Sequence, residues 1–181
     1  MSTPAWSLRP ATYDDGPLLA NIAMTAAKDQ GLWPAMTPAE ETEWLEGFAD
    51  WSRDSVDGPD RLEVIEVDGV SMGRLRTQRD HLTVGGMRVP RVGLSGIQLL
   101  PAYQRRGIGT AVIHLLQEEA TGSGGVVELG VEQRNSGARR LYDRLGFVPI
   151  GQEGDEDIMR WTSARAAATT RASQSPLPHR H

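Results

Sequence analysis

The sequence predicts a single domain of the α/β class, in which strands and helices are mixed along the chain. Its 181 residues suit one domain with a sizeable core. An apolar, strand-like run ends at Pro101, and from Ile108 apolar residues recur at helical spacing. Asp68-Gly69 lies between two runs rich in β-branched residues, which predicts a tight hairpin. These patterns predict both a strand–loop–helix unit and antiparallel strands in one fold.

Composition excludes several classes of function. The formal net charge is −5 and the pI is about 5.4, so a general nucleic-acid binder is not expected. The chain has no Cys, which rules out disulfides, thiolate nucleophiles and Cys-ligated zinc, and no pair of His shows ligand spacing. No apolar run approaches the roughly 18 residues of a membrane span, and the N-terminus does not read as a signal peptide. We therefore expect a cytoplasmic protein with no membrane partner and no metal site.

The N-terminal third predicts a strand and two helices. Residues 6–10 form the strand, and Asp14 or Asp15 caps a first helix that has Pro17 in its first turn. The sequence around 31–34 interrupts this pattern. Thr37 and Glu40 then form a capping box for a second helix, with proline at its first position.

The middle and C-terminal parts predict the remaining strands and helices. Strands are expected over 62–67 and 70–78, then after a turn at Gly85-Gly86, and over 92–100, 126–131, 147–150 and 157–161. One helix follows the loop 101–107, and a short one over 136–145 is capped by Asn135 or Ser136 and stopped by Gly146. The domain covers residues 1–162, and residues 163–181 are predicted to be a disordered or weakly helical tail.

The loop between Pro101 and Ile108 predicts an anion-binding site. Backbone N–H groups at a helix start lack intrahelical partners and carry the positive end of the helix dipole. Gly107 and Gly109 let an anion approach that backbone closely, and Arg105 and Arg106 add positive charge there. Thr110 and Ala111 follow Gly109, so the loop is not a Walker A motif, and Val112 replaces the third glycine of the dinucleotide fingerprint.

A second motif lies about 25 residues further on, from Asn135 to Phe147. It reads Asn-x-x-Ala-x-x-Leu-Tyr and ends in Leu-Gly-Phe. Taken alone, Tyr142 would be a core aromatic residue with its hydroxyl bonded to some backbone group. Together with Gln-x-x-Gly-x-Gly at Gln104, Gly107 and Gly109, this motif resembles the GNAT N-acetyltransferase superfamily. The resemblance spans residues 8–161 by order of elements, and its sharp matches lie between Ile97 and Phe147.

The resemblance implies a particular fold and a particular cofactor. The fold would be a mixed, mostly antiparallel, seven-stranded sheet flanked by about four helices, with two parallel strands near 92–100 and 126–132 that splay apart. Acetyl-CoA would lie in that gap, with its pantetheine on the strand backbone, its pyrophosphate on the loop amides and its sulfur facing a catalytic Tyr142. The implied cofactor-binding residues are Leu99, Leu100, Gln104, Arg105, Arg106, Gly107, Ile108, Gly109, Thr110, Asn135 and Ala138.

The implied reaction is direct attack of an amine on the thioester. An alkyl ammonium group titrates near about 10, so a base has to remove its proton, and a phenol such as Tyr142 can protonate the departing thiolate. A backbone N–H near Leu99 would hold the oxyanion. Many family members carry an acidic base on the strand before the glycine loop, but this chain has Ser95 and Gly96 there. A water chain, Glu132 and His81 remain open as alternatives.

The acceptor is the least determined part of this interpretation. We expect a primary amine of a small molecule, and the alternatives are a protein or peptide amine, an acyl-CoA-binding module without catalysis, and a structural α/β domain. Thiol release with an amine panel and a CoA titration would separate these possibilities. The acidic turn 153–157 would attract a cation if it lines the pocket. A homodimer is left open.

The aromatic residues of the second predicted helix allow two interpretations. Trp44, Phe48 and Trp51 share one helical face, for which core packing is the first interpretation. The alternative is contact with the acceptor, because the loop between the first two helices borders the acceptor pocket in the superfamily. Trp33 and Met36 are the residues of that loop to follow.

Overall fold

A seven-stranded mixed sheet is the centre of the molecule. The computed structural model describes residues 5–173, and its strands follow the order β1-β2-β3-β4-β5-β7-β6. Only β4 and β5 pair in parallel, as the resemblance implied. The strands are β1 (Trp6–Pro10), β2 (Arg61–Val67), β3 (Val70–Val84), β4 (Met87–Leu99), β5 (Val126–Glu132), β6 (Val148–Glu153) and β7 (Glu156–Thr162).

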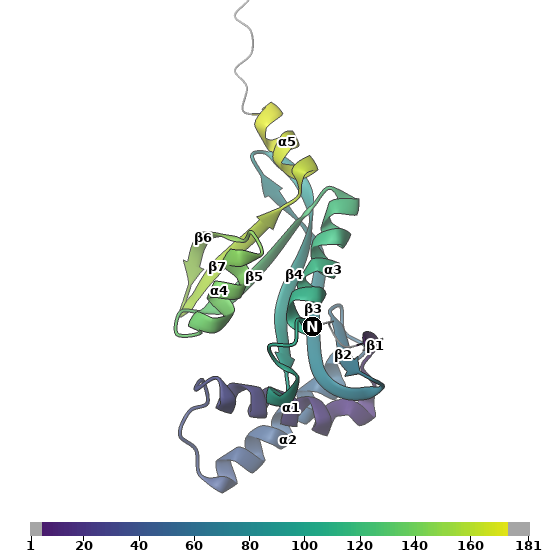
Figure 1. The fold of residues 1–181 in the computed structure, drawn as a ribbon, viewed down its shortest axis with the longest axis vertical. Helices are drawn as coiled ribbons and strands as arrows, with labels where there is room; N and C mark the ends of the chain where they lie inside the picture. Colours follow the sequence, from purple (N-terminus) through teal and green to yellow (C-terminus); the bar gives the residue numbers. More distant parts are fainter. Residues whose placement is uncertain (1–4, 174–181) are drawn as a thin grey trace, which may run out of the picture.

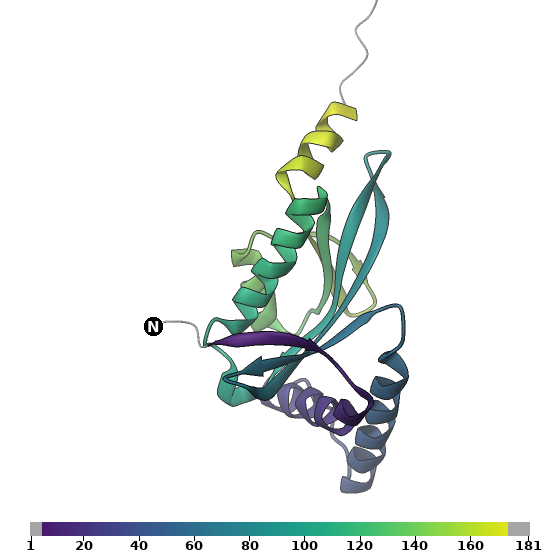
Figure 2. The same cartoon turned by 90° about the vertical axis from the view of Figure 1, so that its right-hand side faces the viewer.

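Helices cover both faces of this sheet (Figures 1 and 2). Buried residues of α3, among them Ile108 and Val112, share one hydrophobic core with Leu94 and Leu99 of β4. On the opposite face, α1 and α2 pack together and lie against β3 and β4. The helices are α1 (Gly16–Asp29), α2 (Pro38–Ser55), α3 (Ile108–Ser123), α4 (Ser136–Arg144) and α5 (Ala164–Ser173), with 3₁₀ turns η1 (Tyr13–Asp15) and η2 (Pro101–Tyr103). None of the helices within residues 5–173 is long and apolar enough to cross a membrane.

A fork in the sheet separates β4 from β5. The two strands pair only where residues 91–94 of β4 meet residues 126–129 of β5, and beyond that point they diverge (Figure 1). The divergence coincides with a β-bulge in β4, where Leu94 pairs with Thr77, Gly96 pairs with Arg76 and Ser95 has no partner. A bulge bends a strand and increases its twist, which explains why the pairing ends there. The predicted splayed strands are thus confirmed.

Most turn and cap signals were accurate, but Asp15 makes no side-chain cap bond to α1 and binds Arg9 instead. Asp68 and Gly69 have φ values of 52° and 78°, as a two-residue hairpin requires. Thr37 and Glu40 form the capping box of α2, and Asn135 caps α4. The strand lengths were underestimated, because β3 and β4 run unbroken into the turn at Gly85-Gly86 and form one long hairpin.

Part of the predicted tail is helical. We expected residues 163–181 to be disordered or weakly helical, and residues 164–173 form α5. Ala166 is only 2% exposed and packs with Val89 and Val126, and the Ser163 hydroxyl accepts a hydrogen bond from the Ala166 N–H. A single buried alanine and a serine cap gave no apolar periodicity to detect. Residues 174–181 lie outside the described part of the chain.

Candidate functional site

At the open end of the fork, the start of α3 leaves three backbone N–H donors without a partner in the described chain. The first bond from the helix back to its cap runs from the Ala111 N–H to the Gly107 carbonyl, at 2.9 Å. No described residue accepts from the N–H groups of Ile108, Gly109 or Thr110. Gly107 has a φ of 83°, where only glycine is unstrained, and it has no side chain with which to cap the helix. These open amides favour binding of an anion.

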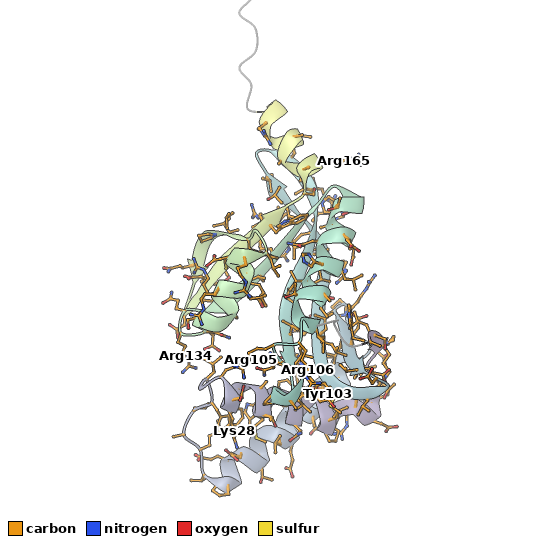
Figure 3. All side chains as sticks on the ribbon, viewed as in Figure 1. Lys28, Tyr103, Arg105, Arg106, Arg134 and Arg165 are labelled. Carbon is orange, nitrogen blue, oxygen red and sulfur yellow. The ribbon has the colours of Figure 1, made fainter. Side chains whose placement is uncertain are left out.

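Positive charge and open space surround these amides. An added Cβ at Gly109 would meet no atom within 4 Å, so the backbone is accessible there. The Arg106 guanidinium lies 5.2 Å from the centre of the Tyr103 ring, and Arg105 adopts a φ of 56°. Figure 3 shows Arg105, Arg106 and Arg134 around the open end of the fork, with Lys28 below them. The open amides and the two loop arginines thus lie at the same helix start, and binding of an anion there stays a prediction.

The free edge of β4 offers backbone groups to a ligand in the fork. The Leu100 N–H donates to the Met72 carbonyl of β3, and the Leu100 carbonyl accepts from the Tyr103 N–H. Leu100 has therefore no backbone group left for the predicted pantetheine contact. Because alternate residues of a strand point to opposite edges, the Leu99 N–H faces the fork. Leu99 is the better candidate, and Ile97 presents its backbone on the same edge.

Two further predicted residues position the loop. Gln104 donates from Nε2 to the Leu99 carbonyl at 2.9 Å, so it ties the loop to the end of β4. The Ile108 side chain is fully buried in the main core, which anchors the first turn of α3. What Ile108 offers to an anion is its free amide, and the contribution of Gln104 is to hold the loop in place.

Across the fork, α4 carries the residues of the second motif. Asn135 Oδ1 accepts from the Ala138 N–H at 3.1 Å, and Asn135 Nδ2 lies 3.3 Å from Gln30 Oε1 at the end of α1. The neighbouring Arg134 donates to the Leu32 carbonyl at 3.2 Å. Asn135 is thus the cap of α4. Together with Arg134, it links the start of α4 to the α1–α2 loop. Ala138 packs half-buried against the main core.

Tyr142 on α4 has a buried ring that carries a phenol hydroxyl. The residue is 7% exposed, and its ring centre lies 5.7 Å from that of Phe147. Burial raises the pKa of the Tyr142 phenol to about 12. Desolvation alone shifts this pKa, with no hydrogen bond from a described residue, and the hydroxyl is not among the fully enclosed polar atoms that lack a partner. This phenol is protonated at neutral pH and available to a ligand.

A polar pocket of about 300 Å³ lies where the strands diverge. It is formed by β3, β4 and β5 together with the β6–β7 hairpin. Glu128 at its wall is held by Arg91, at 3.2 Å, and by Arg160, at 2.8 Å. Glu153 and Glu156 also line the pocket and have no ion-pair partner among the described residues. The pocket is lined by Gln78, Arg91, Gly93, Leu94, Ser95, Glu128, Leu129, Gly130, Glu153, Glu156 and Ile158.

Comparison with known proteins identifies the family. Residues 26–147, more than half of the chain, match the model of the acetyltransferase (GNAT) family. The chain belongs to the GNAT family. A search of curated proteins finds no match. The class of chemistry is therefore acyl transfer, and the fork, the loop and the pocket are the candidate parts of its active site.

Solved structures share the GNAT fold at low identity. PaiA N-acetyltransferase of Thermoplasma acidophilum, in complex with coenzyme A, has a TM-score of 0.67 and 16% identity over 87% of this chain and 99% of its own. RimJ of Mycobacterium smegmatis, in complex with CoA-disulfide, has a TM-score of 0.60 and 19% identity, over 94% of this chain and 91% of its own. YncA of Salmonella typhimurium, with its cofactor acetyl-CoA, has a TM-score of 0.56 and 20% identity, over 87% of this chain and 94% of its own.

His81 and Glu132, which the sequence suggested as possible general bases, lie outside the polar pocket between β4 and β5. His81 pairs with Pro90 in the distant part of the β3–β4 hairpin, where β4 has not yet reached β5. Glu132 is held by Arg134 at 2.8 Å. Glu156 lies closer to the fork, because a Cβ added at Gly130 of β5 would collide with the Glu156 carboxylate. Of the acidic turn 153–157, Glu153 and Glu156 line the pocket.

Three aromatic residues of α2 form a row with Trp33 of the α1–α2 loop, on the α1–α2 side of the sheet. Ring centres of Trp33 and Trp44 lie 4.7 Å apart, those of Trp44 and Phe48 4.8 Å, and those of Phe48 and Trp51 5.1 Å. None of the four contributes to the hydrophobic clusters of the described residues. Core packing was therefore the wrong interpretation for this face. The signal was present, since α2 carries three aromatic residues on one face while few of its other side chains are apolar, and Trp33 of the α1–α2 loop extends the row.

Proposed function

We propose that this chain transfers the acetyl group of acetyl-CoA to a primary amine of a small molecule. The observation that carries the proposal is the open start of α3 at the foot of the fork. Three free amides and two arginines there match a pyrophosphate, and the free edge of β4 matches the amide groups of pantetheine. Coenzyme A contains both groups in one molecule.

In the proposed reaction the amine nitrogen bonds to the thioester carbon, and the carbon–sulfur bond then breaks. The Leu99 N–H points into the fork and stabilises the oxyanion that develops on the carbonyl oxygen. Tyr142 gives its proton to the departing thiolate, because its phenol stays protonated and no hydrogen bond to a described residue contributes to its pKa shift. The products are an N-acetylated amine and the free thiol of coenzyme A.

We assign removal of the amine proton to Glu156. Its carboxylate lies against Gly130 at the fork and is not held by an arginine of the described residues, in contrast to Glu128. Glu156→Gln should slow transfer by about 10²-fold, the low end for a general base, and should leave acetyl-CoA affinity unchanged. Glu153→Gln is the matched control on the same turn. Equal rates for Glu156→Gln and the parent would show that water removes the proton.

The experiment that tests the function follows the release of thiol from acetyl-CoA. A panel of small primary amines is compared with lysine-containing peptides, because a pocket of about 300 Å³ suits a small ligand. We expect release with small amines and little with peptides. Binding of acetyl-CoA without release in any mixture would favour a non-catalytic acyl-CoA-binding module. Release with peptides alone would make the acceptor a protein amine.

A further inference from the structure

Arg74 of β3 is a buried cation on the acceptor side of the fork. The residue is 5% exposed, and its Cζ lies 5.1 Å from the Phe48 ring centre and 5.9 Å from that of Trp51. Its Nη1 donates to Gln98 Oε1 of β4 at 2.7 Å, and its Nε is buried with no hydrogen-bond acceptor in the described chain. Aromatic rings therefore cover the guanidinium from the α2 side, while the sheet lies beneath it.

No carboxylate among the described residues pairs with Arg74. Two other arginines of the same strand have one: Arg76 binds Asp60, and Arg79 binds Glu119 at 2.7 Å. Burial lowers the pKa of Arg74 to about 10, and the positive charge of Arg76 acts in the same direction. A buried charge without a counter-charge is strongly unfavourable, and π faces attract a cation without neutralising it. Within the chain described, the counter-ion of Arg74 is missing.

Arg74 lies beside the point where β4 and β5 diverge. Its Nη1 would be 3.5 Å from a Cβ added at Gly96, so the guanidinium lies over the residue that follows the bulge at Ser95. Ser95 also lines the acceptor pocket. The guanidinium is therefore the charged group nearest to this part of β4 on the α2 side of the sheet, and its charge is positive.

Opposite charges lie on the two sides of the fork near this pocket. Arg74 does not line the pocket itself but lies over Gly96, next to the pocket residue Ser95. Glu153 and Glu156 line the pocket on the β5–β7 side. A ligand that complements this arrangement has a negative group toward β3 and a positive group toward the acidic turn. A simple alkylamine complements only one side, whereas a zwitterion complements both.

We propose that Arg74 binds a carboxylate of the acceptor, so that the acceptor is an amino acid or a similar amine that carries a carboxylate. This inference rests on the proposed function and specifies its substrate class. The guanidinium has free N–H groups in a planar fork, which matches a carboxylate. The acceptor ammonium then lies toward Glu156, which takes its proton before attack.

The test compares amino acids with their carboxamides as acceptors. Each pair keeps the amine and the side chain and differs by the negative charge. We expect the parent protein to prefer the acid in kcat/KM by about 10- to 100-fold, the range for a hydrogen-bonded charge. Arg74→Gln should abolish this preference and change the rate with the carboxamide only a few-fold. Arg76→Gln, on the same strand but paired with Asp60, should keep it.

Two readouts separate failure of the inference from failure of the function. Melting temperatures show whether Arg74→Gln is folded, and Arg74→Met serves as a second variant that keeps the volume. Calorimetry measures binding of the same amino acids without catalysis. Binding that depends on Arg74 without acetyl transfer would support the inference and refute the function. Transfer to carboxamides at least as fast as to acids, or no binding of any amino acid, would overturn the inference.

Discussion

Helices α3 and α4 both follow strands of the fork, yet they begin in opposite ways. At α4 the Asn135 side chain accepts from the Ala138 N–H, so the chain caps its own helix. At α3 the equivalent position is Gly107, which has no side chain, and three amides stay open. A helix start that the chain caps is complete without a ligand, whereas an uncapped start at the end of a fork is available to an anion.

The largest expected difference between the two helix starts comes from placing an aspartate at the same position of each. Gly109 and Gly137 each occupy the second position of their helix, and neither would clash through an added Cβ. Gly109→Asp should weaken acetyl-CoA binding by about 10³-fold, because like charges some 4 Å apart repel by about 4 kcal/mol at an effective dielectric constant of 20. Gly137→Asp should change the affinity only slightly. Calorimetry with both variants decides, and equal losses would refute the assignment.

The next effect concerns the phenol on α4. Tyr142→Phe should slow the chemical step by about 10²-fold, the low end for a general acid, because a thiolate leaves fairly well without help. Acetyl-CoA affinity and the free energy of unfolding should hold, since no hydrogen bond to a described residue contributes to the pKa shift of this phenol. Single-turnover rates measure this. An unchanged rate would make Tyr142 a packing residue and leave proton donation to solvent.

The raised pKa of Tyr142 gives a prediction about pH. Burial keeps the phenol protonated until the pH approaches about 12, so the donor is not lost between pH 7 and 10. From pH 7 to 10, the single-turnover rates of the parent and of Tyr142→Phe should therefore depend on pH in the same way. A decline near pH 9 that is absent in Tyr142→Phe would mean that the phenol titrates lower and that the burial argument is wrong.

The smallest effect sharpens the comparison from the capped side. Asn135→Ala removes the cap of α4 and should lower the free energy of unfolding by about 0.5–2 kcal/mol. Thr37→Ala at the start of α2 is the control, because it removes a cap far from the fork. Only Asn135→Ala should also reduce acetyl-CoA affinity, by up to about tenfold, if Asn135 contacts the pantetheine. Denaturant titration and calorimetry report the two effects separately.

The sequence predicted the loop at the start of α3 far better than the contacts around the pocket. Gln104, Gly107 and Gly109 lie within six residues, so their spacing already specifies a loop at a helix start. The proposed acceptor site joins α2, β3, β4 and the β6–β7 turn. Arg74 and Gln98 are 24 residues apart, and nothing in either segment alone indicates that they meet.

Long-range placement also explains the remaining errors. Whether the α2 aromatics enter the core or face the acceptor depends on how α2 lies on the sheet, which helical periodicity does not encode. The same limit applied to α5, which is held by Ala166 against residues of two distant strands. Cap and turn signals, in contrast, act between neighbours, and they predicted the starts of α2 and α4 and the β2–β3 turn.

The most direct measurement of the central claim is a titration of the ¹⁵N-labelled protein with coenzyme A followed by NMR. If the open start of α3 binds the pyrophosphate, the amide signals of Ile108, Gly109 and Thr110 should shift most. The first-turn amides of the capped α2 should stay in place, and those of α4 should shift less. Shifts spread evenly over all three helix starts, or none at residues 108–110 under saturating coenzyme A, would contradict the account.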